Sequence, residues 1–394
     1  MGAKYMFCLC LFVWIAEAHF ESKVFNVKDY GAIADGKTDN SATFLKAWSE
    51  ACNWNGSARI LIPNETYILN PVMFSGPCKG LMNFTIKGIL KAPTDPYLFG
   101  DDWINFRYVN NLTVSGGGTL DGQGYLAWPL NECSKNSNCP TLPATMVFDF
   151  ITNSHVHDLR SIDSKHSHFV IYACQNMTFT ELALQAPRDS PNTDGIKIGM
   201  SNGINITRVR IGTGDDCIAI LSGSKKIWIS DVFCGPGHGI SVGSLGQNDG
   251  EEDVEDIVVK NCTFIGTLDG VRIKTWASPL NQTLNASNFV YENLFMINVE
   301  HPINIDQEYC PYPPCKKTEV ASNVQIRNVT FKNILGSSST GVGVDLKCSN
   351  YKPCQDIKVE DINLWPHGGR GNLSNFCYYA NGASYGEQIP PSCI

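Results

Sequence analysis

Three residues suited to acid–base chemistry recur at equal spacing along the chain. Asp194, Asp216 and His238 lie 22 residues apart, and a glycine stands within two residues of each. A period of 20–25 residues with small turn residues is typical of a coil that stacks on itself. Residues at the same phase of such a coil lie above one another, about 5 Å apart per turn. The spacing therefore predicts two carboxylates and an imidazole in one line, an arrangement suited to proton transfer.

Further charged residues belong to the same repeat. Asp215 precedes Asp216, and Arg272 and Lys274 follow about one coil after His238. Gathered aspartates repel one another, so a purely structural role needs a bound cation, and calcium is that alternative. Arg272 and Lys274 argue against calcium. They alternate on one strand and project to the same side, where they suit a carboxylate ligand better than surface solubility alone.

Short apolar runs separated by turn residues fill most of the chain. Within one period, residues 204–206, 209–211 and 218–220 read as three short strands with no helical pattern between them. Three strands per repeat predict an all-β fold, a right-handed parallel β-helix. No linker or change of composition divides residues 19–394, so we expect a single catalytic domain.

One amphipathic helix is expected near the beginning of the chain. Asp39 is predicted as its N-cap, and the helix extends to about Cys52. Phe44, Leu45, Trp48 and Cys52 recur at helical spacing and predict one apolar face. Because a solenoid needs its first coil covered, this helix is interpreted as the cap.

Composition and charge narrow the class of function. The 394 residues are 43% hydrophobic and 17% charged, which favours a β-rich globular protein over a disordered one. With a formal net charge of −8, the chain does not resemble a basic nucleic-acid-binding protein. A polyanionic substrate would therefore need a local basic patch to attract it.

Residues 1–18 have the layout of a secretory signal peptide. Lys4 precedes an apolar run over residues 5–16, and Ala16-Glu17-Ala18 predicts cleavage after Ala18. A membrane anchor is the alternative, but the run is short for a membrane span. Cleavage leaves 14 of the 16 cysteines, and glycosylation sequons begin at Asn64, Asn83 and elsewhere. These features predict an extracellular protein with no membrane contact after processing.

Close cysteines predict local disulfides rather than zinc sites, because they lack paired C-x-x-C spacing. The predicted pairs are Cys133/Cys139, Cys217/Cys234, Cys310/Cys315, Cys348/Cys354 and Cys377/Cys393.

Four short strings carry a family resemblance by their order and spacing. They are Asn192-Thr193-Asp194-Gly195, Gly214-Asp215-Asp216-Cys217, Gly237-His238-Gly239 and Arg272-Ile273-Lys274. Together they resemble the polygalacturonases of glycoside hydrolase family 28. The strings Ser190-Pro191-Asn192-Thr193-Asp194 and Gln307-Glu308-Tyr309-Cys310-Pro311 resemble most the pollen-type exopolygalacturonases of plants.

The resemblance implies hydrolysis of α-1,4 bonds in de-esterified pectin with inversion, from the chain end. It implies that Asp215 donates the proton, that Asp194 and Asp216 hold and deprotonate water, and that His238 tunes the acid. The neighbouring carboxylates are expected to raise the pKa of Asp215 and keep it protonated in mildly acidic surroundings.

For substrate binding the resemblance and the strand pattern indicate Arg272, Lys274, Tyr309, Asn192 and His168. A zinc site built on the pairs His155/His157 and His166/His168 is a weaker alternative, since neither pair has an acidic or cysteine partner in phase. We expect no metal and no organic cofactor, and a monomer in the cell wall. Three rival functions stay open: an endo-acting polygalacturonase, a calcium-dependent pectate lyase, and a non-catalytic pectin-binding protein.

Overall fold

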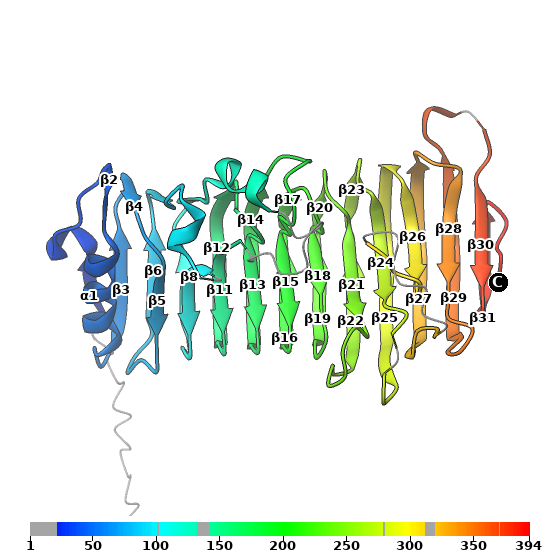
Figure 1. Ribbon diagram of the computed structural model, residues 1–394, viewed down its shortest axis with the longest axis horizontal. Coiled ribbons are helices and arrows are strands. Elements are labelled where there is room, and N and C mark those ends of the chain that lie inside the picture. The colour runs from blue at the N-terminus through cyan, green and yellow to red at the C-terminus, as the bar shows by residue number, and fades with distance from the viewer. Residues whose placement is uncertain (1–21, 101, 132–141, 279, 312–319, 370) are drawn as a thin grey trace, which may run out of the picture.

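Short parallel strands stack into a long coil that runs the length of the molecule (Figure 1). The computed structural model describes residues 22–394 except 101, 132–141, 279, 312–319 and 370. The helix α1 stands at one end of the stack and the C-terminus at the other. The prediction of a right-handed parallel β-helix is confirmed.

One sheet of eleven described strands carries Arg272 and Lys274 and stands directly after the predicted catalytic residues in each coil, and we call it the site sheet. Each of its strands pairs in parallel with the strand of the next coil, in the order β5 to β30. Its members are β5 (Val72–Ser75), β8 (Asp102–Arg107), β11 (Ala144–Asp149), β13 (Phe169–Tyr172), β15 (Ile196–Gly199), β18 (Ile218–Ile220), β21 (Ile240–Leu245), β24 (Asp269–Thr275), β26 (His301–Asp306), β28 (Val342–Lys347) and β30 (Ser374–Tyr378).

The other described strands form the remaining walls of the coil. They are β1 (Ser22–Asn26), β2 (Asp35–Asp39), β3 (Ser57–Ile62), β4 (Thr66–Ile68), β6 (Met82–Ile86), β7 (Ile89–Lys91), β9 (Leu112–Ser115), β10 (Thr119–Asp121), β12 (Thr152–Ile162), β14 (Gln175–Gln185), β16 (Asn202–Thr207), β17 (Arg210–Gly212), β19 (Lys225–Ser230), β20 (Phe233–Cys234), β22 (Val254–Lys260), β23 (Thr263–Ile265), β25 (Leu284–Val299), β27 (Val324–Ser338), β29 (Cys354–Pro366) and β31 (Ala380–Ile389). Short 3-10 turns lie at η1 (Val27–Tyr30), η2 (Pro96–Leu98), η3 (Gly124–Leu126), η4 (Trp128–Leu130) and η5 (His367–Gly369).

The three predicted strands of a coil are separate in some coils and partly joined in others. Strands β16, β17 and β18 match the predicted runs at residues 204–206, 209–211 and 218–220. In the preceding coil the single strand β14 pairs with both β16 and β17, because the chain bends there without breaking its ladder.

The core is a set of side-chain columns inside the coil. Ile196, Ile218 and Ile240 are register partners on successive strands and are at most 1% exposed. Alternation along each strand turns the intervening residues outward. The 22-residue period is therefore fixed by stacked apolar side chains, each of which contributes roughly 1.5–3 kcal/mol by its burial.

The cap helix forms where expected, with two corrections. Helix α1 (Ser41–Cys52) has Asn40 as its N-cap, while the carboxylate of Asp39 accepts a hydrogen bond from the Ser41 amide at 3.0 Å. Leu45 does not belong to the buried face and is 38% exposed. The helix instead buries Phe44 and Trp48 together with two alanines, because small residues let it lie close to the coil.

Four disulfides join described cysteines. Cys217–Cys234, Cys348–Cys354 and Cys377–Cys393 confirm three predicted pairs, and Cys52–Cys78 was not predicted. The predicted pairs Cys133/Cys139 and Cys310/Cys315 include residues outside those described. Cys174 and Cys262 are buried free thiols.

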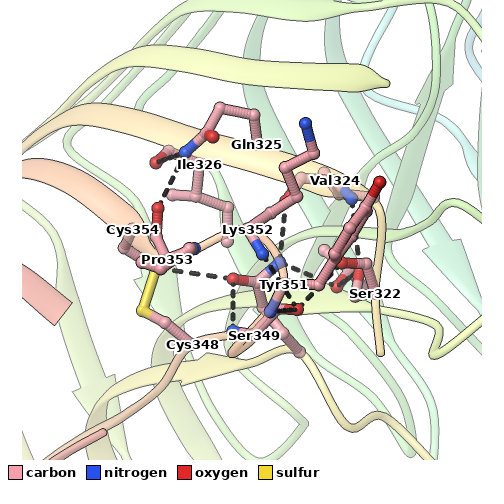
Figure 2. The surroundings of a disulfide bond; sticks show 12 residues. Ser322, Val324, Gln325, Ile326, Cys348, Ser349, Tyr351, Lys352, Pro353 and Cys354 are labelled. Carbon is pink, nitrogen blue, oxygen red and sulfur yellow. Dashed lines mark hydrogen bonds between the residues drawn. A yellow bond between two sulfur atoms is a disulfide. The ribbon is translucent and has the colours of Figure 1, made fainter. Parts of the chain in front are cut away.

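Figure 2 shows the loop closed by Cys348–Cys354. Inside it the Ser349 hydroxyl accepts hydrogen bonds from the amides of Tyr351 and Lys352, at 3.2 and 3.3 Å, and donates one to the Ser322 carbonyl. These contacts fix the loop against the start of β27. No helix among the described residues has both the length and the apolar character needed to cross a membrane.

Candidate active site

Strand register gathers the predicted catalytic residues at one edge of the site sheet. Asp194, Asp216 and His238 each stand two residues before a strand, and the three strands that follow are paired in register. The prediction that they share one phase of successive coils is confirmed. Arg272 and Lys274 lie two coils beyond Asp216, on β24.

A tight turn places Asp215 and Asp216 in the same site. The Asp215 carboxylate accepts a hydrogen bond from the Asp216 amide at 2.8 Å, which turns its side chain back over the strand entrance. Gly214 makes the turn possible by its size. A Cβ atom on Gly214 would lie 2.0 Å from the Ser190 carbonyl oxygen, so any side chain there collides with the neighbouring coil.

Asp216 is the most heavily bonded of the three aspartates. Its carboxylate accepts hydrogen bonds from Ser241 and Lys274, both at 2.8 Å, and from Arg272 at 3.1 Å. Arg272 also pairs with Asp269 at 2.9 Å. Burial would lower the pKa of Lys274, but the charge of Asp216 outweighs it and raises that pKa. Both cations therefore stay charged, and they hold the two oxygens of Asp216 in place.

Asp215 and His238 form a second ion pair nearer the surface. The His238 Nδ1 atom lies 3.1 Å from an Asp215 oxygen, and both side chains are partly exposed. Burial alone would raise the pKa of Asp215, but the hydrogen bond and charge of His238 outweigh it, so that pKa lies below its usual value. Burial would lower the pKa of His238, but its bond to Asp215 raises that pKa.

The expected rise in the pKa of Asp215 is therefore wrong for the ligand-free protein. Among the three aspartates of the site, Asp194 is the one whose pKa rises, to about 7. Burial is the main cause, and the charge of Lys197, 3.3 Å away, offsets only part of it. Between mildly acidic and neutral pH, Asp194 carries a proton while the Asp215–His238 pair shares another.

Asn192 lies beside Asp215, whereas Tyr309 lies beside the two cations. The Asn192 amide donates to Asp215 at 3.4 Å, and Asn131 donates to the Asn192 carbonyl at 3.0 Å. The Tyr309 ring centre lies 5.3 Å from the Lys274 ammonium and 6.0 Å from the Arg272 guanidinium carbon. Tyr309 therefore stands beside the two cations that were predicted, like it, to bind the substrate.

The segment that carries Tyr309 is fixed by the disulfide loop of Figure 2. Gln307 is 1% exposed and its amide donates to the Val324 carbonyl at 2.9 Å. Its carbonyl accepts from the Ser349 amide at 3.0 Å, and the Tyr309 amide donates to Thr275 at 3.2 Å. A loop far along the chain thus anchors the tyrosine.

His168 needs a correction. Its side chain has no exposed surface and its Nδ1 atom lies 2.7 Å from the Ser161 hydroxyl inside the coil. Burial lowers the pKa of His168 to about 3, so it is a neutral internal residue. A fully buried ring cannot touch a bound polymer, so His168 is not included among the proposed substrate-binding residues.

The chemistry of the donor set does not favour a resident metal. Asp215, Asp216 and His238 each place one possible ligand atom within 4.8 Å of the others. However, both oxygens of Asp216 are already bonded to Arg272 and Lys274. A divalent cation would have to displace these two positive charges, so we assign no metal role to this group.

Three site residues were missed by the sequence analysis. Lys197 pairs with Asp194, Ser241 bonds to Asp216, and Asp269 pairs with Arg272. Lys197 and Ser241 alternate with buried isoleucines or valines on their strands, so their outward direction was readable from the pattern. Which partner each one reaches depends on its rotamer, and the pattern does not contain that information.

The comparisons with known proteins agree with this geometry. The profile of the family described as "Glycosyl hydrolases family 28" matches residues 52–384. An exopolygalacturonase of Platanus acerifolia is 44% identical over 93% of this chain and 97% of its own length. A polygalacturonase of Gossypium hirsutum is 42% identical over 98% of this chain and 95% of its own. The solved endo-xylogalacturonan hydrolase of Aspergillus tubingensis shares the fold, with a TM-score of 0.80 at 24% identity over 93% of this chain and all of that one. The chain belongs to family 28 of the glycosyl hydrolases.

Proposed function

We propose that the protein hydrolyses α-1,4-galacturonosyl bonds of de-esterified pectin with inversion and releases galacturonate from the non-reducing end. One observation carries the proposal: three carboxylates meet beside a buried arginine and lysine at one edge of a parallel β-helix. The carboxylates suit glycosidic bond cleavage, and the cations suit an acidic sugar.

Asp215 is proposed as the proton donor, with His238 as its proton store. In the ligand-free site the shared proton rests on the imidazole, since the pKa of Asp215 is lowered and that of His238 is raised. A bound galacturonate brings negative charge next to Asp215 and raises its proton affinity. The proton then moves to Asp215 and on to the leaving glycosidic oxygen.

Asp194 and Asp216 are proposed to hold the attacking water on the opposite face of the sugar. Inversion needs a base that is separate from the acid and has room for water between them. Asp216, which is paired with Arg272 and Lys274, accepts the proton from water. Asp194, which has its own proton, orients the water by hydrogen bonding.

Arg272, Lys274 and Tyr309 are proposed to bind the sugar next to the bond that breaks, and Asn192 to steady Asp215. Arg binds a carboxylate through two parallel hydrogen bonds, whereas Lys adds a point charge. Tyr309 covers both cations and offers its ring to the sugar.

The early products of polygalacturonate digestion test the reaction and its mode together. Galacturonate as the sole early product is expected, and a ladder of oligomers would mean endo cleavage instead. Unsaturated products would mean a lyase. If no new reducing ends formed, the protein would be a non-catalytic pectin-binding protein. The variant Asp215→Asn is the matched control, since asparagine has nearly the shape of aspartate but no acid proton to donate.

We further propose that residues 1–18 are removed and that the mature protein is an extracellular monomer. The relatives named exopolygalacturonase support an enzyme that acts on cell-wall polymer. Secretion from plant cells should give a protein whose N-terminal sequence begins at His19, with the mass of one chain plus sugars. A retained leader would refute the proposed processing.

A further inference from the structure

Lys197 places a third cation in the active site, on the other side of the aspartates from Arg272 and Lys274. It lies in β15 between Ile196 and Ile198, which are fully buried in the core. Its side chain therefore points outward from the site sheet. On the three strands that follow, its register partners are Ala219, Ser241 and finally Arg272.

The two groups of cations hold different carboxylates. Arg272 and Lys274 reach back to Asp216 from β24, whereas the Lys197 ammonium lies 3.3 Å from Asp194. Asp194 and Asp216 occupy the same phase of successive coils, about 5 Å apart along the axis. Positive charge consequently stands on both sides of the point where the aspartates meet.

Lys197 is also more open than its counterparts. Its side chain is 25% exposed, against 7% for Lys274 and 10% for Arg272. The register positions between Lys197 and Arg272 hold the small, buried side chains of Ala219 and Ser241, so no bulky side chain on these strands separates the two cations. The ammonium group of Lys197 is the one of the three that solvent reaches most easily.

We propose that Lys197 binds the carboxylate of the galacturonate unit across the scissile bond from the unit held by Arg272 and Lys274. The inference rests on the proposed function and deepens it, because it assigns acid recognition to both sugars that share the bond. In the ligand-free site Lys197 is paired with Asp194, and a substrate carboxylate can replace this partner. Since the pKa of Asp194 is raised to about 7, this carboxyl is neutral in mildly acidic solution and competes weakly for the ammonium.

The charged neighbours of Lys197 agree with this role. Besides Asp194, His166 lies close enough for its pKa to be lowered, to about 3, by burial and then by the charge of Lys197. His166 therefore stays neutral and adds no repulsion. Asp215 and Asp216 also act on Asp194, but Asp215 is already paired with His238, and Asp216 with Arg272 and Lys274.

Trigalacturonate and its monomethyl esters, each esterified on a different unit, test the inference. A charge-assisted hydrogen bond lost from a substrate costs about 10- to 100-fold in affinity. We expect Lys197→Gln to raise KM for the free acid by about this factor with a smaller change in kcat. The same variant should no longer discriminate against the ester on one particular unit. Arg272→Gln should instead lose discrimination at the adjoining unit. Lys197→Arg keeps the positive charge and should therefore keep the discrimination that Lys197→Gln loses.

Lys225→Gln is the matched control. Lys225 is a strand lysine that pairs with Glu255 at 3.8 Å on another wall of the coil, away from the aspartates. It should leave KM and ester discrimination unchanged. If Lys197→Gln keeps the wild-type discrimination at every unit, the lysine serves only Asp194 and the inference is overturned. If the wild-type protein hydrolyses none of the substrates, the proposed function itself fails, which is a different result.

Discussion

Replacement of Asp194 by asparagine should change how protein stability depends on pH. In the folded protein the pKa of Asp194 is about 7, against an ordinary value of 3.8. Between these two values the folded state binds more protons than the unfolded state, so the contribution of Asp194 to stability falls as pH rises. Asparagine has the same shape and no charge, and it lacks this dependence.

The size of the effect follows from the two pKa values. At about 1.4 kcal/mol per pKa unit, the raised pKa of Asp194 destabilises the folded state by roughly 4 kcal/mol at pH 8 and by about 1 kcal/mol at pH 4.5. The variant should therefore gain roughly 3 kcal/mol relative to wild type across this interval. With an unfolding entropy of about 2.1 cal/mol/K per residue, that gain corresponds to a relative rise in Tm of about 4 °C.

Calorimetric or urea unfolding of both proteins at several pH values measures this difference. Asp29→Asn, on an exposed carboxylate of η1, controls for a general loss of negative charge and should follow the wild-type pH dependence within a few tenths of a kcal/mol. Parallel curves for wild type and Asp194→Asn from pH 4.5 to 8 would refute the reasoning, because they would mean that Asp194 ionises normally in the folded protein.

Three other substitutions have definite expected outcomes. Asp215→Asn should reduce kcat on galacturonate oligomers by about 10²- to 10⁴-fold. On an aryl galacturonide, whose leaving group needs no proton, the loss should be under about tenfold. Equal losses on both substrates would contradict the role of Asp215 as the acid. Gly214→Ala puts a Cβ atom 2.0 Å from the Ser190 carbonyl oxygen, so it should cost about 1–3 kcal/mol of stability and most of the activity, and an unchanged Tm would argue against the tight turn. Trp48→Ala, which empties the contact of α1 with the coil, should cost about 3–5 kcal/mol in urea unfolding while kcat of the folded fraction is unchanged.

The architecture was predictable because it depends on local pattern. Runs such as Ile218–Ile220 show their inward side by alternation, and the 22-residue period follows from columns of such residues. The catalytic phase of the coil was readable for the same reason. The buried face of the cap helix was harder to predict. Leu45 has the right spacing for that face, but the small side chains of Ala47 and Ala51 fit closer to the coil and take the buried positions.

The electrostatics of the site were not predictable, because they depend on which charged atoms meet. A row of three aspartates suggests mutual repulsion and a raised pKa at the middle one. In the structure His238 reaches Asp215 at 3.1 Å and lowers its pKa, while the burial of Asp194 raises the pKa at a different position. The prediction that His168 binds the substrate was wrong for a related reason. His168 stands just before β13, and its ring is buried inside the coil against Ser161 rather than turned outward.

These assignments give the cleft a charge balance suited to an acidic polymer. The chain as a whole carries a formal charge of −8, so long-range forces repel pectin. Within the site, Arg272 and Lys274 are balanced by Asp216 and Asp269, and His238 by Asp215. Among the described residues, Lys197 is the cation whose partner, Asp194, has a raised pKa of about 7. If Lys197 binds a galacturonate as proposed, the proton on Asp194 leaves its positive charge free for that sugar in acidic surroundings, and the preference for the free acid should weaken as the pH rises through about 7.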